Sequence, residues 1–214
     1  MIAIIDYGMG NLRSVQKAIE ASGGKTMVIT SGRALSGAAK IVFPGVGAFG
    51  DAMRELKKRK FIAPIKKAIR AGKPFLGLCL GLQLLFEESE EGGRVKGLGI
   101  LKGKVRRFKF APYAARRTQH ALKIPHMGWN TITRRTPYAV RSTDILHDIP
   151  DSSFMYFVHS YYVAPEDRSV ILTTTDYGVR FVSGVCKANV YGLQFHPEKS
   201  QGVGLKILRN FVRL

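Results

Sequence analysis

The feature that most constrains the fold of this chain is a cysteine placed between two glycines, Gly77-Leu-Cys79-Leu-Gly81. Apolar residues 75–78 before it read as a short buried strand, and leucines recur at helical spacing after it. Glycines on either side relieve crowding at a sharp strand-to-helix turn, which lifts a nucleophile toward substrate, and a helix N-terminus favours a thiolate. The pattern predicts a nucleophilic Cys79; the alternative is an inert buried cysteine.

Short apolar strands alternate with amphipathic helical patterns through the first half of the chain. The predicted strands are residues 2–5, 26–29, 41–43 and 75–78, followed in the second half by 103–108, 131–133, 154–163, 170–175 and 190–195. Helical patterns cover residues 12–19, behind a possible Asn11 cap, and 61–69, with a further helix expected from Asp51. This rhythm predicts an α/β fold with a mostly parallel central sheet, helices on both faces and an antiparallel extension.

A histidine and a carboxylate stand together near the C-terminus, as His196 and Glu198. A histidine exchanges protons near neutrality, and a carboxylate can hold the ring by accepting its other N–H. Alone, the pair reads as a surface turn, because Pro197 lies between the two residues. Together with Cys79 the residues follow the order nucleophile, base and carboxylate, so the sequence predicts a cysteine version of a catalytic triad.

The segment Pro44-Gly45-Val46-Gly47 follows another predicted strand. Glycines there let backbone N–H groups face a ligand, and a tetrahedral intermediate on Cys79 would need such donors for its oxyanion. Taken alone the segment is a tight turn. Ligands of open α/β sheets bind at the carboxyl ends of the strands, so we expect this loop and Cys79 at the same edge.

Several separated motifs carry a family resemblance. Besides the elbow and the glycine loop they are Asp6-Tyr-Gly-Met-Gly-Asn11, Pro125-His-Met-Gly-Trp-Asn130, Tyr156-Phe-Val-His-Ser-Tyr161 and Gln194-Phe-His-Pro-Glu-Lys-Ser200. In this order they resemble the class I, triad-type glutamine amidotransferases, and within that class the family of glutaminase subunits of imidazole glycerol phosphate synthase. The one long stretch without family signal is about residues 102–122.

The resemblance implies that Cys79 attacks the side-chain amide of glutamine, that His196 transfers the proton, and that Glu198 orients His196. Glutamate and ammonia would be the products, with no cofactor and no metal. The residues it implies for the oxyanion and glutamine sites are Gly45, Val46, Gly47, Leu80, Gln83, Glu91, Ser160 and Tyr161. Glu91 would meet the α-amino group, although residues 87–91 alone read as a solvated helix end.

The resemblance also implies a partner, a separate (β/α)8-barrel cyclase that uses the ammonia to make imidazole glycerol phosphate and aminoimidazole carboxamide ribonucleotide in histidine biosynthesis. Its interface positions would be Asn11, Trp129, Tyr156 and Lys187. Alone, Trp129 and Tyr156 read as core packing. No catalytic role is assigned to His126 or His159. We expect a glutaminase that is nearly idle without the cyclase.

The 214 residues, 45% of them hydrophobic, suit one domain spanning 1–214 with a sizeable core. No long apolar run and no N-terminal leader are seen, so we expect a cytoplasmic protein. The two cysteines, Cys79 and Cys186, show no disulfide framework and no metal-ligand spacing. We interpret Cys186 as a strand residue without chemistry.

The formal net charge is +19 and the pI about 10.2. Residues 92–143 contain thirteen Lys and Arg and no acid, and residues 54–73 contain nine opposed by Glu55 alone. Such a surface would serve to bind phosphate groups, to dock an acidic partner, to attract an anionic substrate or to keep the protein soluble. No nucleic-acid-binding motif accompanies it, so a basic nucleic-acid-binding module is the weaker alternative. The stronger one is a glutaminase of another synthase, for anthranilate, aminodeoxychorismate or pyridoxal phosphate.

Overall fold

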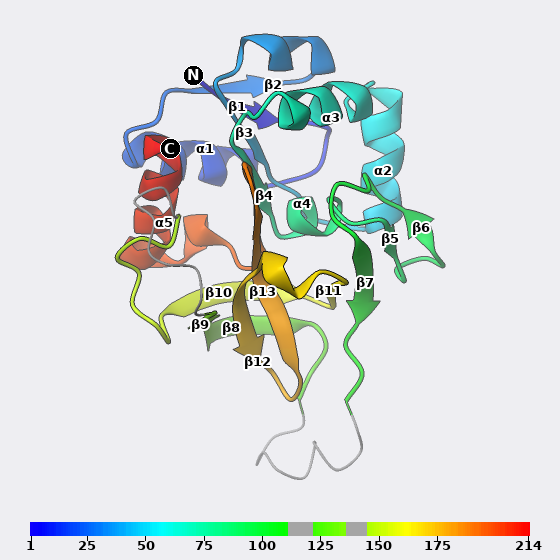
Figure 1. Cartoon of the computed structure of the whole chain (residues 1–214), viewed down its shortest axis with the longest axis vertical. Helices are drawn as coiled ribbons and strands as arrows, with labels where there is room; N and C mark the ends of the chain where they lie inside the picture. The colour runs from blue at the N-terminus through cyan, green and yellow to red at the C-terminus, as the bar shows by residue number, and fades with distance from the viewer. Residues whose placement is uncertain (111–121, 136–144) are drawn as a thin grey trace.

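The computed structural model describes residues 1–110, 122–135 and 145–214. Its centre is a sheet whose first half is parallel (Figure 1). The parallel strands, in spatial order, are β2 (Thr26–Ile29), β1 (Ile2–Ile5), β3 (Lys40–Phe43), β4 (Phe75–Leu78) and β14 (Val190–Leu193). Each of these strands is four residues long and mainly apolar, as expected for strands covered on both faces.

The sheet continues beyond β14 as the expected antiparallel extension. It runs through β13 (Arg180–Lys187), β11 (Tyr161–Pro165), β7 (Gly103–Arg107), β5 (Glu88–Ser89) and β6 (Val95–Lys96), with β12 (Ile171–Asp176) and β9 (Thr133–Arg134) joined to β13. Only the short β5–β7 pair in it is parallel. A separate antiparallel ribbon is formed by β8 (His126–Thr131) and β10 (Phe154–His159). The predicted fold class is confirmed.

Helices cover both faces of the parallel half. Those on one face are α1 (Leu12–Ala21) and α5 (Gln201–Arg213), and those on the other are α2 (Phe49–Lys58) and α3 (Ile62–Arg70). Side chains alternate along β1, so Ala3 and Ile5 pack with α2 and α3 while Ile2 and Ile4 pack with α1 and α5. The remaining helical turns are η1 (Gly32–Gly37), α4 (Leu80–Gln83), η3 (Arg168–Val170) and η4 (Pro197–Lys199).

Several predicted elements differ from the structure. The helix after Cys79 is a single turn, because beyond Leu84 the backbone bonds tighten to the residue three positions back, and Leu84 and Leu85 fill the core from this turn. Residues 154–163 are not one strand, since the chain leaves the β8–β10 ribbon at Ser160 and enters the main sheet. The short strand predicted at 131–133 covers the last residue of β8 and the first residue of β9, two separate strands. Of the stretch 102–122, residues 111–121 lie outside the described part.

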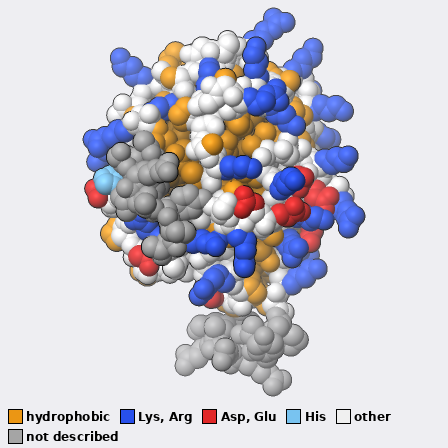
Figure 2. All heavy atoms as spheres, in the orientation of Figure 1, with side chains coloured by type: hydrophobic (Ala, Val, Ile, Leu, Met, Phe, Trp, Pro, Cys, Tyr) orange, Lys and Arg blue, Asp and Glu red, His pale blue; other side chains and the backbone are white. Residues whose placement is uncertain are grey.

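Basic side chains are not concentrated in one place on the face drawn in Figure 2. Lys and Arg side chains stand along the upper, left and right edges of its described part rather than in a single stripe. A duplex or single strand of nucleic acid is usually held along a continuous basic track. This face therefore offers no support for the nucleic-acid alternative.

Candidate active site

The strand, turn and nucleophile form the predicted elbow. Cys79 follows β4 directly and has φ 51° and ψ −105°, a strained conformation for a residue with a side chain. Its N–H donates to the Leu193 carbonyl at the end of β14 (2.7 Å). A Cβ on Gly77 would come within 2.7 Å of the Gly81 carbonyl, and one on Gly81 would overlap the Phe43 carbonyl of β3. Close backbone packing therefore requires both glycines.

His196 and Glu198 lie just beyond the end of β14 and are both buried. The Nδ1 of His196 donates to Oε1 of Glu198 at 2.8 Å, so the proton-transferring nitrogen is Nε2, which has no hydrogen-bond partner among the described residues. Burial disfavours the charged ring, but the adjacent Cys79 and Glu198 outweigh burial and raise the pKa of His196 to about 10. The structure thus brings the three predicted residues together, with the imidazole protonated.

A cavity of about 290 Å³ opens beside Cys79. Its other lining residues are Val46, Gly47, Leu80, Gln83, Glu91, Pro125, Val158, His159, Ser160 and Tyr161. Seven of these were expected at the oxyanion or glutamine site, and Gly45 lines a smaller recess that also contains His196 and Glu198. Segments from the glycine loop, the elbow and the β10–β11 junction therefore converge on one concave site.

Glu91 does not stand at a solvated helix end, and that interpretation of residues 87–91 is wrong. The segment enters the sheet as β5, and the Glu87 carboxylate accepts from Gly103 N–H (2.9 Å). Oε2 of Glu91 accepts from the backbone N–H of Phe49 (2.8 Å), the first residue of α2, which begins two residues before the predicted start. These bonds hold the carboxylate at the cavity that contains Cys79.

Two buried glutamines connect the cavity wall to the nucleophile. Nε2 of Gln83 donates to the Tyr161 carbonyl (3.0 Å) and to Oε1 of Gln194 (3.2 Å). Nε2 of Gln194 in turn lies 3.7 Å from the sulfur of Cys79. Gln194 was not among the residues predicted for the site. The sequence pattern that identifies it is a polar residue directly after an apolar strand, inside the same motif as His196.

Two buried histidines fix the wall on the other side. Nε2 of His159 accepts from Nδ1 of His126 (3.0 Å), and Nδ1 of His159 donates to the Tyr161 carbonyl (2.8 Å). Burial lowers the pKa of His126 to about 4 and that of His159 to about 3, so both rings are neutral. Their nitrogens are committed to structural bonds, and we continue to assign neither ring to proton transfer.

One expected oxyanion donor is already occupied. The backbone N–H of Leu80 points at the carbonyl oxygen of Gly45, 3.4 Å away. A developing oxyanion needs a free N–H at this position, and a carbonyl oxygen would repel it. In this arrangement of the glycine loop, the elbow has its nucleophile and base while its oxyanion site is filled by a carbonyl.

The outer face of the β8–β10 ribbon is apolar and exposed. Met127, Trp129 and Phe154 are 62%, 47% and 61% exposed. Trp129 stands opposite the half-buried Tyr156, with ring centroids 6.0 Å apart. The interpretation of Trp129 as core packing is therefore wrong, because nearly half of this residue is exposed.

The other two expected interface residues, Asn11 and Lys187, are both exposed. The side-chain oxygen of Asn11 accepts from Ser14 N–H (3.4 Å), so this residue is the predicted N-cap of α1. Lys187 ends β13. Cys186 beside it lies in the same strand, opposite Tyr191 of β14, as predicted.

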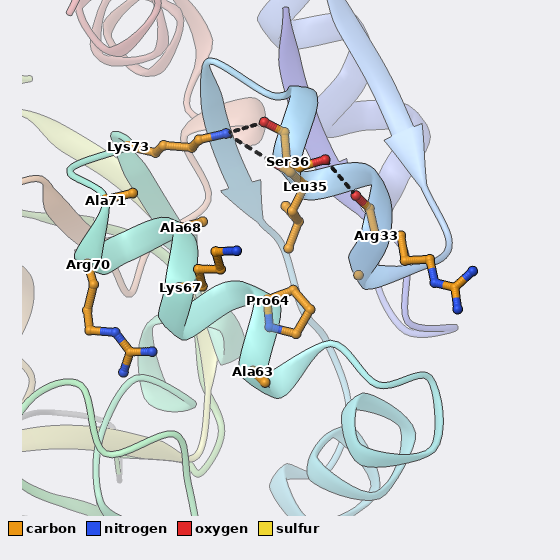
Figure 3. Close-up of a pocket in the computed structure, with 11 residues that line it drawn as sticks. Arg33, Leu35, Ser36, Ala63, Pro64, Lys67, Ala68, Arg70, Ala71 and Lys73 are labelled. Atoms are coloured by element: carbon orange, nitrogen blue, oxygen red, sulfur yellow. Dashed lines mark hydrogen bonds between the residues drawn. The ribbon is translucent and has the colours of Figure 1, made fainter.

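A larger cavity of about 550 Å³ lies away from Cys79, between η1 and α3 (Figure 3). The ammonium group of Lys73 donates to the carbonyls of Leu35 and Ser36, which fixes η1 against the cavity. Figure 3 shows Arg33 and Arg70 extending away from it. Its lining contains no His, Cys, Asp or Glu, and the ammonium group of Lys73 is committed to backbone carbonyls.

No group of three or more His, Cys, Asp or Glu side chains in residues 1–110, 122–135 and 145–214 is arranged to hold a metal ion. Within the same ranges, no helix has the length and apolar character needed to cross a membrane.

Comparisons with known proteins agree with this geometry. Residues 3–214 match the family model described as glutamine amidotransferase class-I. The imidazole glycerol phosphate synthase subunit HisH of Aquifex aeolicus is 51% identical over 211 residues, covering 98% of this chain and 95% of that protein. HisH of Geobacter sulfurreducens is 50% identical over 212 residues, covering 98% and 97%.

Solved structures show the same fold at low identity. A glutamine amidotransferase crystal structure superimposes with a TM-score of 0.74 at 15% identity, covering 100% of both chains. The structure of PurLQS from Thermotoga maritima gives 0.71 at 18% identity, covering 99% of this chain and 97% of that one. The chain belongs to the class-I glutamine amidotransferase family. Within that class it belongs with the HisH subunits of imidazole glycerol phosphate synthase, which it matches over nearly its full length.

Proposed function

We propose that this chain is the glutaminase subunit of an imidazole glycerol phosphate synthase and supplies ammonia for histidine biosynthesis. The observation that carries the proposal is the arrangement of Cys79, His196 and Glu198 beside a cavity lined by the expected glutamine-site residues. About 50% identity to HisH subunits supports the choice of this synthase over the other ammonia-using ones.

The proposed reaction begins with the Cys79 thiolate attacking the side-chain carbonyl carbon of glutamine. The tetrahedral intermediate collapses as the His196 imidazolium gives its proton to the departing nitrogen, which leaves as ammonia. A γ-glutamyl thioester remains on Cys79. Water then attacks the thioester while neutral His196 takes a proton from it, and glutamate leaves as the sulfur is released. Glu198 holds the His196 ring throughout by accepting from Nδ1.

Glutamine recognition is assigned to the cavity wall. Glu91 supplies a carboxylate for the α-amino group of glutamine, and its bond to the α2 N-terminus keeps that carboxylate in place. Gln83 and the backbone near Ser160 and Tyr161 face the rest of the substrate. Gln83 and His159 both donate to the Tyr161 carbonyl, so this wall is held from two sides before substrate arrives.

The oxyanion site explains why we expect little activity from the isolated subunit. The hydrogen bond from Leu80 N–H to the Gly45 carbonyl must break before this N–H can stabilise an oxyanion. A rotation of the Gly45–Val46 peptide would remove that carbonyl and turn the Val46 N–H toward the site. Docking of a partner that favours the rotated loop would raise turnover, and an uncoupled subunit would not waste glutamine.

The proposed partner is a separate (β/α)8-barrel cyclase, which would form a heterodimer with this chain. The exposed apolar face of the β8–β10 ribbon supports a docking surface there, and Asn11, Trp129, Tyr156 and Lys187 are its proposed contacts. The backbone of Tyr156 accepts from His196 N–H (2.9 Å), so the ribbon is bonded to the catalytic segment. We propose that the subunit acts in the cytoplasm as one domain, residues 1–214.

The test is glutamate release from glutamine by wild type and Cys79→Ala, each with and without the cyclase and imidazole glycerol phosphate. We expect release only by wild type with the cyclase present. Release that survives Cys79→Ala would refute the assigned nucleophile. Stimulation by the anthranilate or aminodeoxychorismate partner instead of the cyclase would refute the assigned synthase.

A further inference from the structure

One buried hydroxyl beside the active site has no partner and no role so far. Tyr7 follows β1 in the Asp6-to-Asn11 motif, is fully buried and packs its ring on Phe43, 5.4 Å between centroids. Its hydroxyl makes no hydrogen bond to any described residue. Buried polar groups are rarely left unsatisfied, and those that are call for an explanation such as a second functional state. Burial, with a smaller effect from Cys79, raises the pKa of the phenol, so it remains a donor.

The hydroxyl lies directly against the glycine loop. A Cβ built on Gly45 would clash with the Tyr7 oxygen on one side and come within 3.0 Å of the Leu80 Cβ on the other. The Cα of Gly45 is thus held between the unpaired phenol and the elbow. Its carbonyl is the group that occupies Leu80 N–H in the present arrangement.

The two observations complement each other. When the Gly45 carbonyl leaves Leu80, it becomes a buried acceptor without a donor, and such a group must find another partner. Tyr7 offers an unpaired donor within reach of the same glycine. We propose that Tyr7 is a positioning residue whose hydroxyl donates to the Gly45 carbonyl in the active loop arrangement, leaving Leu80 N–H free for the oxyanion.

This inference rests on the proposed glutaminase function and adds to it the residue that stabilises the active loop. In the resting arrangement the Leu80–Gly45 bond is made and the phenol is unpaired. In the active arrangement the phenol is paired and Leu80 N–H serves the intermediate. Tyr7 thereby favours the active loop without touching substrate.

The matched pair of variants is Tyr7→Phe and Thr175→Val. Tyr7→Phe keeps the buried ring and removes only the oxygen. Thr175 in β12 carries another buried hydroxyl without a partner among the described residues, so Thr175→Val is the control for removing such a group. Each variant is assayed for kcat and KM of glutamate release in complex with the cyclase and imidazole glycerol phosphate, and for Tm.

We expect Tyr7→Phe to lower kcat in the complex by about tenfold, the equivalent of one net hydrogen bond, with KM for glutamine and Tm essentially unchanged. Thr175→Val should match wild type in all three. Wild-type kcat for Tyr7→Phe in the complex would overturn the inference, as would a fall in kcat that comes with a lower Tm, because the hydroxyl would then be structural. Absence of activity in wild type with the cyclase would instead refute the proposed function.

Discussion

The interaction between His196 and Glu198 gives the sharpest prediction, and the change that probes it is Glu198→Gln. The side chain of Glu198 is buried and its Oε1 accepts from His196 Nδ1 at 2.8 Å. Glutamine has nearly the same shape and its amide oxygen can still accept this bond. The substitution therefore removes the negative charge while leaving the packing in place.

The magnitude follows from what the charge does for the imidazolium. A buried hydrogen bond to a charged group contributes about 2–3 kcal/mol, and 1.4 kcal/mol corresponds to a factor of about ten. We therefore expect the pKa of His196 to fall from about 10 by roughly 1.5–2 units in Glu198→Gln. The loss of proton affinity weakens His196 as the base that takes the proton from the Cys79 thiol, so kcat/KM should fall by about 30- to 150-fold.

The assay is the pH dependence of kcat/KM for glutamate release, measured on the complex with the cyclase. Glu20→Gln is the control, because Glu20 is an exposed carboxylate on α1. The pH profile of kcat/KM for Glu20→Gln should match that of wild type. For Glu198→Gln, kcat/KM should be lower throughout, and its decrease at alkaline pH should begin at a lower pH than in wild type. An unchanged profile and a kcat/KM within about threefold of wild type would refute the assigned role of Glu198. A Tm close to wild type shows that the variant remains folded.

Two further predictions concern the docking face and the buried histidines. Trp129→Ala removes a side chain that is 47% exposed, and burying such a side chain at an interface contributes about 2 kcal/mol of binding free energy. Calorimetric titration should therefore show the Kd for the cyclase rising by at least about tenfold. A Kd within about twofold of wild type would contradict the proposed docking face. His126 and His159 are neutral when folded because burial lowers their pKa to about 4 and about 3. The unfolded state therefore binds more protons below about pH 6.5, and stability measured with urea should fall as pH drops from 6.5 to about 4. The free energy of unfolding should decrease less with falling pH in His159→Gln than in wild type. An equal pH dependence in the two proteins would contradict the conclusion that both histidines are neutral in the folded state.

The catalytic elbow was predictable because its chemistry is local. The glycines around Cys79, the strand before it and the turn after it lie within a few residues, and each follows from backbone crowding. The mostly parallel sheet was equally accessible, since apolar runs alternate with helices along the chain. His196 and Glu198 were found for the same reason, as neighbours beyond the end of a strand.

Other features depend on contacts that a residue pattern does not contain. Residues 154–163 form one apolar run, and only the tertiary structure sends its halves into different sheets at Ser160. Trp129 was interpreted as core because it lies in an apolar, strand-like stretch, and a residue pattern does not show that this face of the ribbon is exposed. The direction of the Gly45 carbonyl is a choice between two peptide orientations, and glycine permits both, so the sequence does not specify it.

The position of β10 suggests how docking on an apolar surface would reach the chemistry. Trp129 and Tyr156 point out of the ribbon, while two backbone carbonyls of β10 contact the proposed catalytic residues: that of Tyr156 accepts from His196 N–H, and that of Val158 lies 3.8 Å from the Cys79 sulfur. The proposed cyclase, bound to the outer face, would therefore press on a strand that contacts both the proposed nucleophile and the proposed base. A rigid strand transmits a displacement but does not by itself switch a site on. In our proposal the Gly45 peptide, with one donor in use and another unpaired beside it, is the element with two states, and a partner would raise turnover to the extent that it favours the second.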